Sequence, residues 1–146
     1  MTELTLADPV GLVWEDLENR ILTLEAVRQD KIRHYTAQQF LIEAKTLRLP
    51  AVSVIYMASA PKSQETGAKS LSVTLQFGVH VIGPLGRSKG GEDMSVTEVT
   101  KRIVDVIKGQ RAPTGNEYVY GGEFPFDTGA GVGYVHYWNV SAKFTN

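Results

Sequence analysis

The sequence predicts an α+β fold, in which helices pack on one face of a largely antiparallel or mixed sheet of about four long strands. Apolar residues alternate strictly over 71–81, which indicates a long strand with one buried face. Apolar residues recur at three- and four-residue steps over 9–27 and 95–109, which indicates two amphipathic helices. The expected order along the chain is helix, short strand, helix, two long strands, helix, two long strands.

The first helix is expected to run from Pro9 to Val27. Asp8 suits its N-cap and Pro9 its first position, because proline lacks the N–H that the first turn leaves unbonded. The apolar positions of this segment form one stripe that faces the core: Val10, Val13, Trp14, Leu17, Ile21 and Leu24.

The middle of the chain predicts a short strand, a short helix and a hairpin. Residues 31–35 are consistent with a short strand, and Thr36 with the N-cap of a helix that ends at Ala44. Residues 51–58 are apolar at both alternations, as expected for a strand covered on both faces. A polar connector then leads to the alternating strand over 71–81, so the two strands are expected to form a long antiparallel hairpin.

The last third of the chain predicts a helix followed by two aromatic strands. Ser95 and Glu98 form a capping box, and Gly109 suits the position just after the helix end. Residues 117–126, interrupted by two glycines, and residues 132–144 are then expected to be strands.

Composition indicates a soluble chain of ordinary globular type. The length of 146 residues favours a single domain over 1–146. Fifteen Lys+Arg against sixteen Asp+Glu give a net charge of −1, which provides no overall field for binding nucleic acid or an acidic membrane. No apolar run reaches the roughly 18 residues of a membrane helix, and the N-terminus lacks a signal-peptide pattern. The absence of cysteine excludes disulfides, thiolate metal sites and a cysteine nucleophile.

No residues have the spacing of a catalytic or metal site, so we expect no enzyme activity, no cofactor and no metal. His34, His80 and His136 stand far apart, without the local spacing of a zinc site. From the strand patterns, His80 is expected on a polar surface and His136 as a hydrogen-bonded structural residue on an apolar face. The glycine-rich stretches 83–91 and 129–133 lack the spacing or the following helix of a phosphate loop.

Charged residues of the helices are expected to form solvated surfaces. Glu15, Asp16 and Glu18 cluster in the first helix, where a solvated face explains them better than a metal site. Acidic residues also interrupt the lysines and arginines of the last helix, which argues against a nucleic-acid surface.

Aromatic residues near the C-terminus exceed what one sheet face needs for its core. Tyrosine and tryptophan are enriched in protein interfaces, so part of this set is expected to contact a partner. Our candidates for that interface are Tyr118, Tyr120 and Tyr137.

The sequence resembles the tail terminator proteins of tailed bacteriophages, in particular the small family of Mu-like contractile-tailed phages and related tail-like particles. The similarity spans about residues 10–145 and rests on structural motifs. These are Ile21-Leu22 in the first helix, the entry Leu49-Pro50-Ala51-Val52 into a strand reading VSVIYMASA, the strand SLSVTLQFGVHVIG, the helix VTEVTKRIVDVIKG and the closing strand YVHYWNVSAKF.

The resemblance implies a structural virion protein of the phage tail. Such a protein caps the tail tube as a closed, six-fold homo-oligomeric ring and stops tube polymerisation. Its partners are other copies of itself, the tail tube protein, the head–neck connector and, in a contractile tail, the sheath. Free subunits of such a ring can remain monomeric until a tube end templates assembly. The resemblance also implies a location in the virion tail, after assembly in the bacterial cytoplasm.

The resemblance supplies no catalytic residues, so interface candidates come from the loops. The loop 83–94 contributes Arg87, Lys89, Glu92 and Asp93, and the connector 61–69 contributes Lys62, Glu65 and Lys69. Oppositely charged loops suit a head-to-tail ring, because the cations of one subunit can meet the anions of the next. The segment 121–133 is a third candidate.

Two alternatives stay open at the level of sequence. Another head–tail neck or completion protein would share this composition and architecture. A small-ligand-binding regulatory domain, or an enzyme that uses His136 with nearby carboxylates, would instead require a pocket with convergent polar groups.

Overall fold

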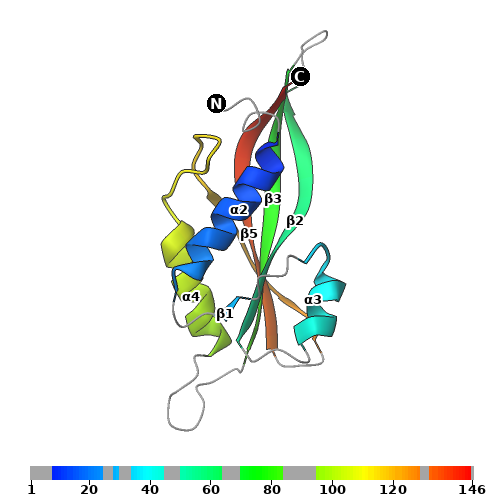
Figure 1. Cartoon of the computed structure of the whole chain (residues 1–146), viewed down its shortest axis with the longest axis vertical. Coiled ribbons are helices and arrows are strands. Elements are labelled where there is room, and N and C mark those ends of the chain that lie inside the picture. The colour runs from blue at the N-terminus through cyan, green and yellow to red at the C-terminus, as the bar shows by residue number, and fades with distance from the viewer. Residues whose placement is uncertain are drawn as a thin grey trace.

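The computed structural model describes residues 8–24, 28–29, 34–44, 50–63, 70–83, 95–128 and 132–145. Its elements are α2 (Pro9–Leu22), β1 (Arg28–Gln29), α3 (Ala37–Ala44), β2 (Ala51–Ser63), β3 (Ser70–Gly83), α4 (Val96–Ile107), β4 (Val119–Phe126) and β5 (Val132–Thr145). They form an α+β fold around one long, twisted sheet (Figure 1), which confirms the predicted fold class. Within the described residues, no helix is both long and apolar enough to span a membrane.

The sheet has the strand order β1-β2-β3-β5-β4. The four long strands are antiparallel to their neighbours, and the short β1 pairs in parallel with β2. After β3 the chain passes through α4 to the edge strand β4 and then returns through β5 to the middle of the sheet. The sheet is therefore mixed, with β4 at one edge and β1 at the other.

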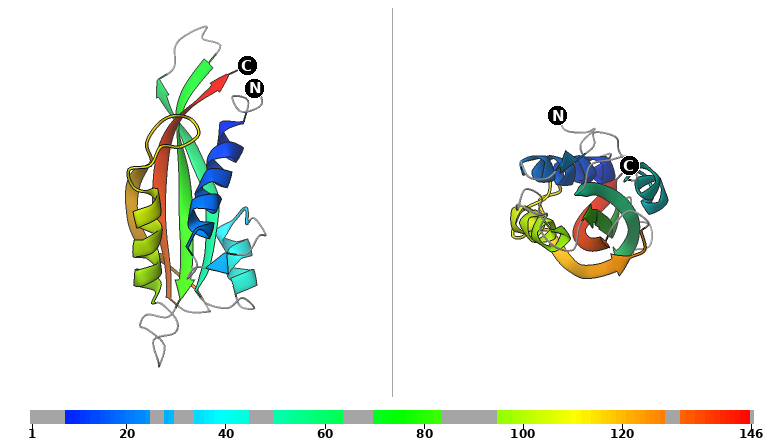
Figure 2. Two further views of the ribbon diagram at one scale, coloured as in Figure 1. Left: turned by 60° about the vertical axis from the view of Figure 1, so that its left-hand side comes forward. Right: turned by 90° about the horizontal axis from the view of Figure 1, so that it is seen from below.

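The first face of the sheet, here called the helical face, is covered by α2 and α4, which lie side by side (Figure 2). The odd-numbered residues of β3 point into this core, as their alternation predicts. Trp14 of α2 donates a hydrogen bond from Nε1 to the carbonyl oxygen of Val54 at 2.8 Å, which ties the helix to β2. The largest buried side chains of this core are Leu17, Ile21, Leu75, Phe77, Ile103, Ile107 and Trp138.

The opposite face of the sheet, here called the α3 face, is partly covered by α3. Phe40 and Ala44 of α3 pack with Ala51, Ile55 and Ile82, which alternate with the residues of the helical face. The expectation that all helices pack on one face is therefore wrong for α3. The even-numbered residues of β3 look polar as a set, but the end that carries Ile82 is apolar and needs this cover.

The helix caps follow the predictions, but the first helix is shorter than expected. Asp8 Oδ1 accepts a hydrogen bond from Gly11 N at 2.9 Å, and Ser95 Oγ accepts one from Glu98 N at 3.3 Å. Thr36 Oγ1 likewise accepts from Gln39 N at 3.1 Å. The helix α2 ends at Leu22 rather than Val27, and in its last turn the backbone N–H groups of Thr23 and Leu24 bond the carbonyls three residues earlier, as in a 3₁₀ turn.

The strands differ from the predictions chiefly in their lengths. The short strand lies at Arg28–Gln29 rather than 31–35, where residues 30–33 lie outside the described residues and His34 and Tyr35 belong to no strand. The hairpin strands are longer than predicted, since β2 continues to Ser63. Residues 60–63 have too few apolar side chains to be recognised as a strand from the sequence. Their pairing with β3 nevertheless holds them extended.

The edge strand β4 contains a break in its pairing with β5. The register shifts between Tyr120 and Glu123, so that Gly121 and Gly122 form a bulge. Gly122 has a φ of +99°, which favours glycine at this position. Pro125 lies beyond the bulge and carries no N–H for a further strand.

Candidate functional site

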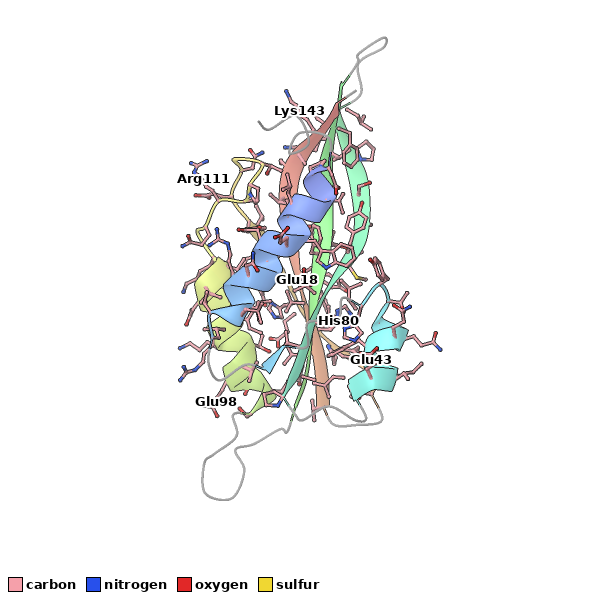
Figure 3. All side chains as sticks on the ribbon, in the orientation of Figure 1. Glu18, Glu43, His80, Glu98, Arg111 and Lys143 are labelled. Atoms are coloured by element: carbon pink, nitrogen blue, oxygen red, sulfur yellow. The ribbon has the colours of Figure 1, made fainter. Side chains whose placement is uncertain are left out.

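Most loop residues proposed from sequence lie outside the described residues. This applies to Arg87, Lys89, Glu92 and Asp93 of one loop and to Glu65 and Lys69 of the other. Lys62 is described: its Nζ donates a hydrogen bond to Ser141 Oγ at 2.9 Å. It therefore lies on β2 over the polar end of the sheet, the end that carries Lys143 in Figure 3.

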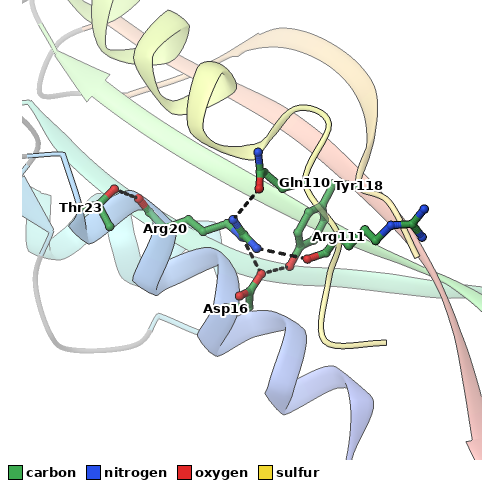
Figure 4. Close-up of polar contacts among 6 residues, drawn as sticks. All are labelled: Asp16, Arg20, Thr23, Gln110, Arg111 and Tyr118. Atoms are coloured by element: carbon green, nitrogen blue, oxygen red, sulfur yellow. Dashed lines mark hydrogen bonds and ion pairs between the residues drawn. The ribbon is translucent and has the colours of Figure 1, made fainter. Parts of the chain in front are cut away.

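Tyr118 is buried and faces the interior. Its hydroxyl donates a hydrogen bond to Asp16 Oδ2 at 2.6 Å, and the burial together with this carboxylate raises the pKa of Tyr118. Figure 4 shows the contact between α2 and the segment that precedes β4. Tyr118 thus holds two parts of the molecule together, and the half-buried Asp16 belongs to this contact rather than to a solvated helix face.

Arg20 completes the same contact (Figure 4). Its Nε pairs with Asp16 Oδ2 at 2.8 Å, and its Nη2 donates to the carbonyl oxygen of Arg111 at 3.1 Å. Its Nη1 reaches Gln110 Oε1 at 3.5 Å. These bonds fix α2 to the connection between α4 and β4, which is a structural role.

Tyr120 and Tyr137 lie on opposite faces of the antiparallel pair β4–β5. Tyr120 is opposite Trp138 on the helical face, and their ring centroids are 5.2 Å apart. Tyr137 lies on the α3 face, where its ring packs on Phe124 at 5.7 Å. Tyr120 is exposed and Tyr137 half-buried, so both rings are accessible to a partner.

An apolar surface crosses the part of the α3 face that α3 leaves uncovered. It consists of Met57, Val119, Phe124 and Tyr137 and is called the open patch below. Val119 is 60% exposed and Phe124 51%, although both lie in a strand. Gly78 lets Met57 lie close to the sheet, since a Cβ there would be 3.2 Å from Met57 Sδ. Register places Gly78 opposite Tyr137, which makes the patch continuous from β2 to β4.

Two histidines are buried in the sheet. His80 lies on the α3 face against the ring of Phe126, with centroids 5.3 Å apart, so the prediction of a surface position is wrong. Burial lowers the pKa of His80 to about 4. His136 is buried on the helical face, where burial and then the nearby His80 lower its pKa to about 3. Neither ring offers an exposed base for a substrate.

The structural role predicted for His136 fits its contacts. Trp138 Nε1 donates a hydrogen bond to His136 Nδ1 at 3.1 Å, which places the proton of the neutral ring on Nε2. That Nε2 has no hydrogen-bond partner among the described residues. A buried donor without a partner costs free energy, so His136 is a weak point of the core rather than a stabilising one.

A third histidine links α3 to the sheet. His34 Nδ1 lies 2.9 Å from Ser53 Oγ, and His34 Nε2 lies 2.7 Å from Glu43 Oε2. The order serine–histidine–carboxylate is that of a hydrolase triad. Here both Ser53 and His34 are buried beneath α3, so no substrate carbonyl can reach the hydroxyl in this arrangement. We assign this network a structural role, which is to fasten α3 to β2.

The sequence analysis missed most of the open patch. Met57, Val119 and Phe124 read as ordinary strand residues, and only pairing across four strands brings them next to Tyr137. Among the described residues, no three potential metal ligands come together. A comparison with protein-family profiles and with curated proteins finds no match for this chain.

Proposed function

We propose that this chain is a structural protein of a phage tail, which caps the tail tube as a closed ring and stops its polymerisation. The proposal starts from the sequence resemblance to tail terminators. The single observation that carries it further is the open patch, an apolar surface on the part of the α3 face that α3 leaves uncovered. Contiguous exposed apolar surface on a small chain is a mark of a protein-binding site.

The arrangement of the molecule suits a subunit of an assembly. A ring subunit has to present surfaces to its neighbours in the ring and separate surfaces to the tube and the neck. The open patch lies on the α3 face, while Lys62, bonded to Ser141, lies at the polar end of the sheet, the end that carries Lys143 in Figure 3. Binding of this kind needs no bond to be made or broken.

The test uses the tail-tube protein of the same virion. Purified tube protein is polymerised with increasing amounts of this chain, and tube lengths are measured by negative-stain electron microscopy. We expect the mean tube length to fall as the ratio of chain to tube protein rises. Gold-labelled chain is expected at one end of each tube.

The control is tube protein mixed with an unrelated protein of the same mass, which should leave tube length unchanged. Unchanged lengths with the chain itself, or gold distributed along the tube walls, would contradict the proposal.

A further inference from the structure

We propose that neighbouring copies of this chain join head to tail through their helices, with the outer flank of α4 in one copy packed on the outer flank of α2 in the next. The outer flank of either helix is the side that faces away from the other helix of the same chain. This inference rests on the proposed ring function and names the surfaces through which one copy binds the next.

The inner flank of α2 is identified by its contacts. Asp16 and Arg20 bond side chains and backbone of the connection between α4 and β4 (Figure 4), so their side of α2 faces α4. Successive residues of a helix are about 100° apart, which places Glu15, Glu18 and Leu22 about 120–180° around the helix from that side. These three residues therefore belong to the outer flank of α2.

The outer flank of α2 is acidic and carries an apolar side chain that the core does not use. Glu15 is exposed, Glu18 is half-buried, and Leu22 is 50% exposed and lies outside the core. The one cation of this helix, Arg20, lies on the inner flank and pairs there with Asp16. The negative charge of the outer flank is therefore not balanced by a basic residue of α2.

The outer flank of α4 is basic. The helices α2 and α4 lie side by side and run in opposite directions (Figure 1), so equivalent flanks of the two helices face each other. Lys101 lies two residues before the buried Ile103, as Glu15 lies two residues before the buried Leu17. Lys108, five residues after Ile103, lies on the same side as Lys101. Both lysines are exposed and belong to the outer flank of α4.

An acidic residue near this flank does not reverse its sign. Lys108 Nζ lies 3.1 Å from Asp105 Oδ1, and both side chains are exposed. An exposed pair of this kind contributes little free energy, so the lysine can exchange Asp105 for a carboxylate of another copy. Lys101 is a second exposed cation, and Arg111 is a third just beyond the helix end. Positive charge therefore prevails along the outer flank of α4.

The two outer flanks match in charge and in spacing. Glu15 and Leu22 are seven residues apart, as are Lys101 and Lys108, which is about two helical turns. In an antiparallel contact, Glu15 meets Lys108, and the aliphatic stem of Lys101 covers Leu22. The contact repeats between copies the antiparallel packing that α2 and α4 already have within one chain.

The charges select a head-to-tail contact over a symmetric one. Two outer flanks of α2 would bring carboxylates together, and two outer flanks of α4 would bring lysines together. A contact between unlike flanks leaves one free flank of each kind, so it can repeat until a ring closes. Exposed charge pairs are weak and screened by salt, so free chains should associate weakly and more strongly at low ionic strength.

The test measures self-association by sedimentation velocity at concentrations up to about 1 mM. We expect the wild-type sedimentation coefficient to rise with concentration in about 20 mM salt and to rise less in about 300 mM salt. Two charge-reversed variants are compared with it at low salt. Glu15→Lys with Leu22→Lys, and Lys101→Glu with Lys108→Glu, should each weaken association at least about tenfold, since each brings like charges together.

A matched control carries the same change in net charge elsewhere. Lys62→Glu with Lys143→Glu replaces two exposed lysines of the strands β2 and β5, outside both helix flanks. This control should associate like the wild type.

Mixing the two charge-reversed variants tests the geometry directly. In an equimolar mixture, each flank of one variant meets an oppositely charged flank of the other. We expect association to recover, with species larger than a dimer, which also shows that both variants are folded. A wild-type chain that stays monomeric at low salt, reversed variants that associate like the wild type, a control that is equally impaired, or a mixture that associates no better than its components would each overturn the junction.

The failure of this proposal is distinguishable from that of the ring cap. If the wild-type chain limits tube length while the charge-reversed variants associate normally, the junction is wrong and the capping function stands. If wild-type chains associate through this junction and tube lengths stay unchanged, the junction is right and the capping function is wrong.

Discussion

Tyr118 and Tyr137 both belong to the C-terminal part of the sequence, but their surroundings in the structure differ. The hydroxyl of Tyr118 bonds Asp16 inside the molecule, whereas the ring of Tyr137 lies half-exposed on the α3 face. One tyrosine therefore contributes to stability and the other remains free to contribute to binding. Both were candidates for the interface, and their local sequence does not separate them.

Replacement of Tyr118 by Phe should destabilise the chain. The variant removes the hydrogen bond to a carboxylate and leaves the half-buried Asp16 with fewer partners, at a cost of about 2 kcal/mol. The free energy of unfolding measured by urea denaturation tests this. Tyr120→Phe is the matched control, because its ring is exposed and its loss of a hydroxyl should change stability by less than about 0.5 kcal/mol. Equal values for the two variants would contradict the role of Tyr118.

The residue environments were predictable where neighbours in sequence decide them. The stripe of α2 and the caps at Asp8 and Ser95 follow from local spacing, and the structure confirms them. The environment of Tyr118 depends on a residue 102 positions earlier, and that of His80 on the ring of Phe126, 46 positions later. Periodicity within one segment carries no information about such contacts.

Among the described helices, α3 buries the fewest side chains. It buries Phe40 and Ala44 fully, and its other link to the sheet is the network of His34, Ser53 and Glu43. In the tautomer with the proton on Nε2, His34 donates to the Glu43 carboxylate and its Nδ1 accepts from the Ser53 hydroxyl. Opening of α3 alone should therefore require less free energy than unfolding of the sheet.

Replacement of Ser53 by Ala should loosen α3 without loosening the sheet. Loss of the bond to His34 is worth about 1 kcal/mol, which corresponds to about a fivefold faster hydrogen exchange. We expect this acceleration in the amides of residues 37–44, measured by mass spectrometry, and no change in β3. Gln38→Ala on the exposed side of α3 serves as the control. Equal acceleration in β3 would mean that the network stabilises the whole molecule instead.

Whole elements were predictable when their pattern was long. The alternation over 71–81 lies within β3, and the capping box of Ser95 marks the start of α4. The two-residue β1 has too few residues for any period, and its parallel pairing with β2 fixes it. The open patch combines residues from three strands, so it depends on register, which the sequence of one strand does not reveal.

At the scale of the whole molecule, the buried His80 and His136 make stability depend on pH. An unfolded histidine binds its proton near pH 6.5, whereas the folded values are about 4 and about 3. Between these limits the unfolded chain binds more protons than the folded one, so stability rises with pH. The free energy of unfolding is therefore highest above about pH 7, and protonation of the two histidines in the unfolded chain lowers it as the pH falls toward 4.

The free energy of unfolding should therefore fall between pH 7 and pH 5. Each histidine contributes about 2 kcal/mol to that loss at pH 5, since the unfolded form is protonated there and the folded form is not. Urea denaturation at pH 7, 6 and 5 measures the slope. His136→Gln keeps an acceptor for Trp138 and should reduce the slope by about half. A wild-type stability that is the same at pH 7 and pH 5 would contradict this account.

The distribution of apolar surface over the two sheet faces links stability to the proposed assembly. The helical face is covered within the chain, and it supplies the larger core. The α3 face is covered at one end and open in the middle, which leaves surface for a neighbour. The alternation over 71–81 predicted one buried face of the sheet, and the position of α3 on the opposite face required the tertiary structure.

The bulge at Gly121–Gly122 and the proline at position 125 have a consequence for how this chain behaves in concentrated solution. An exposed edge strand with apolar residues is a template for growth of amyloid-like fibres. Here the bulge breaks the regular spacing of β4, and Pro125 withholds a donor, so incoming strands find no continuous edge. Concentrated samples should therefore give reversible oligomers that redissolve on dilution, without binding the amyloid dye thioflavin T.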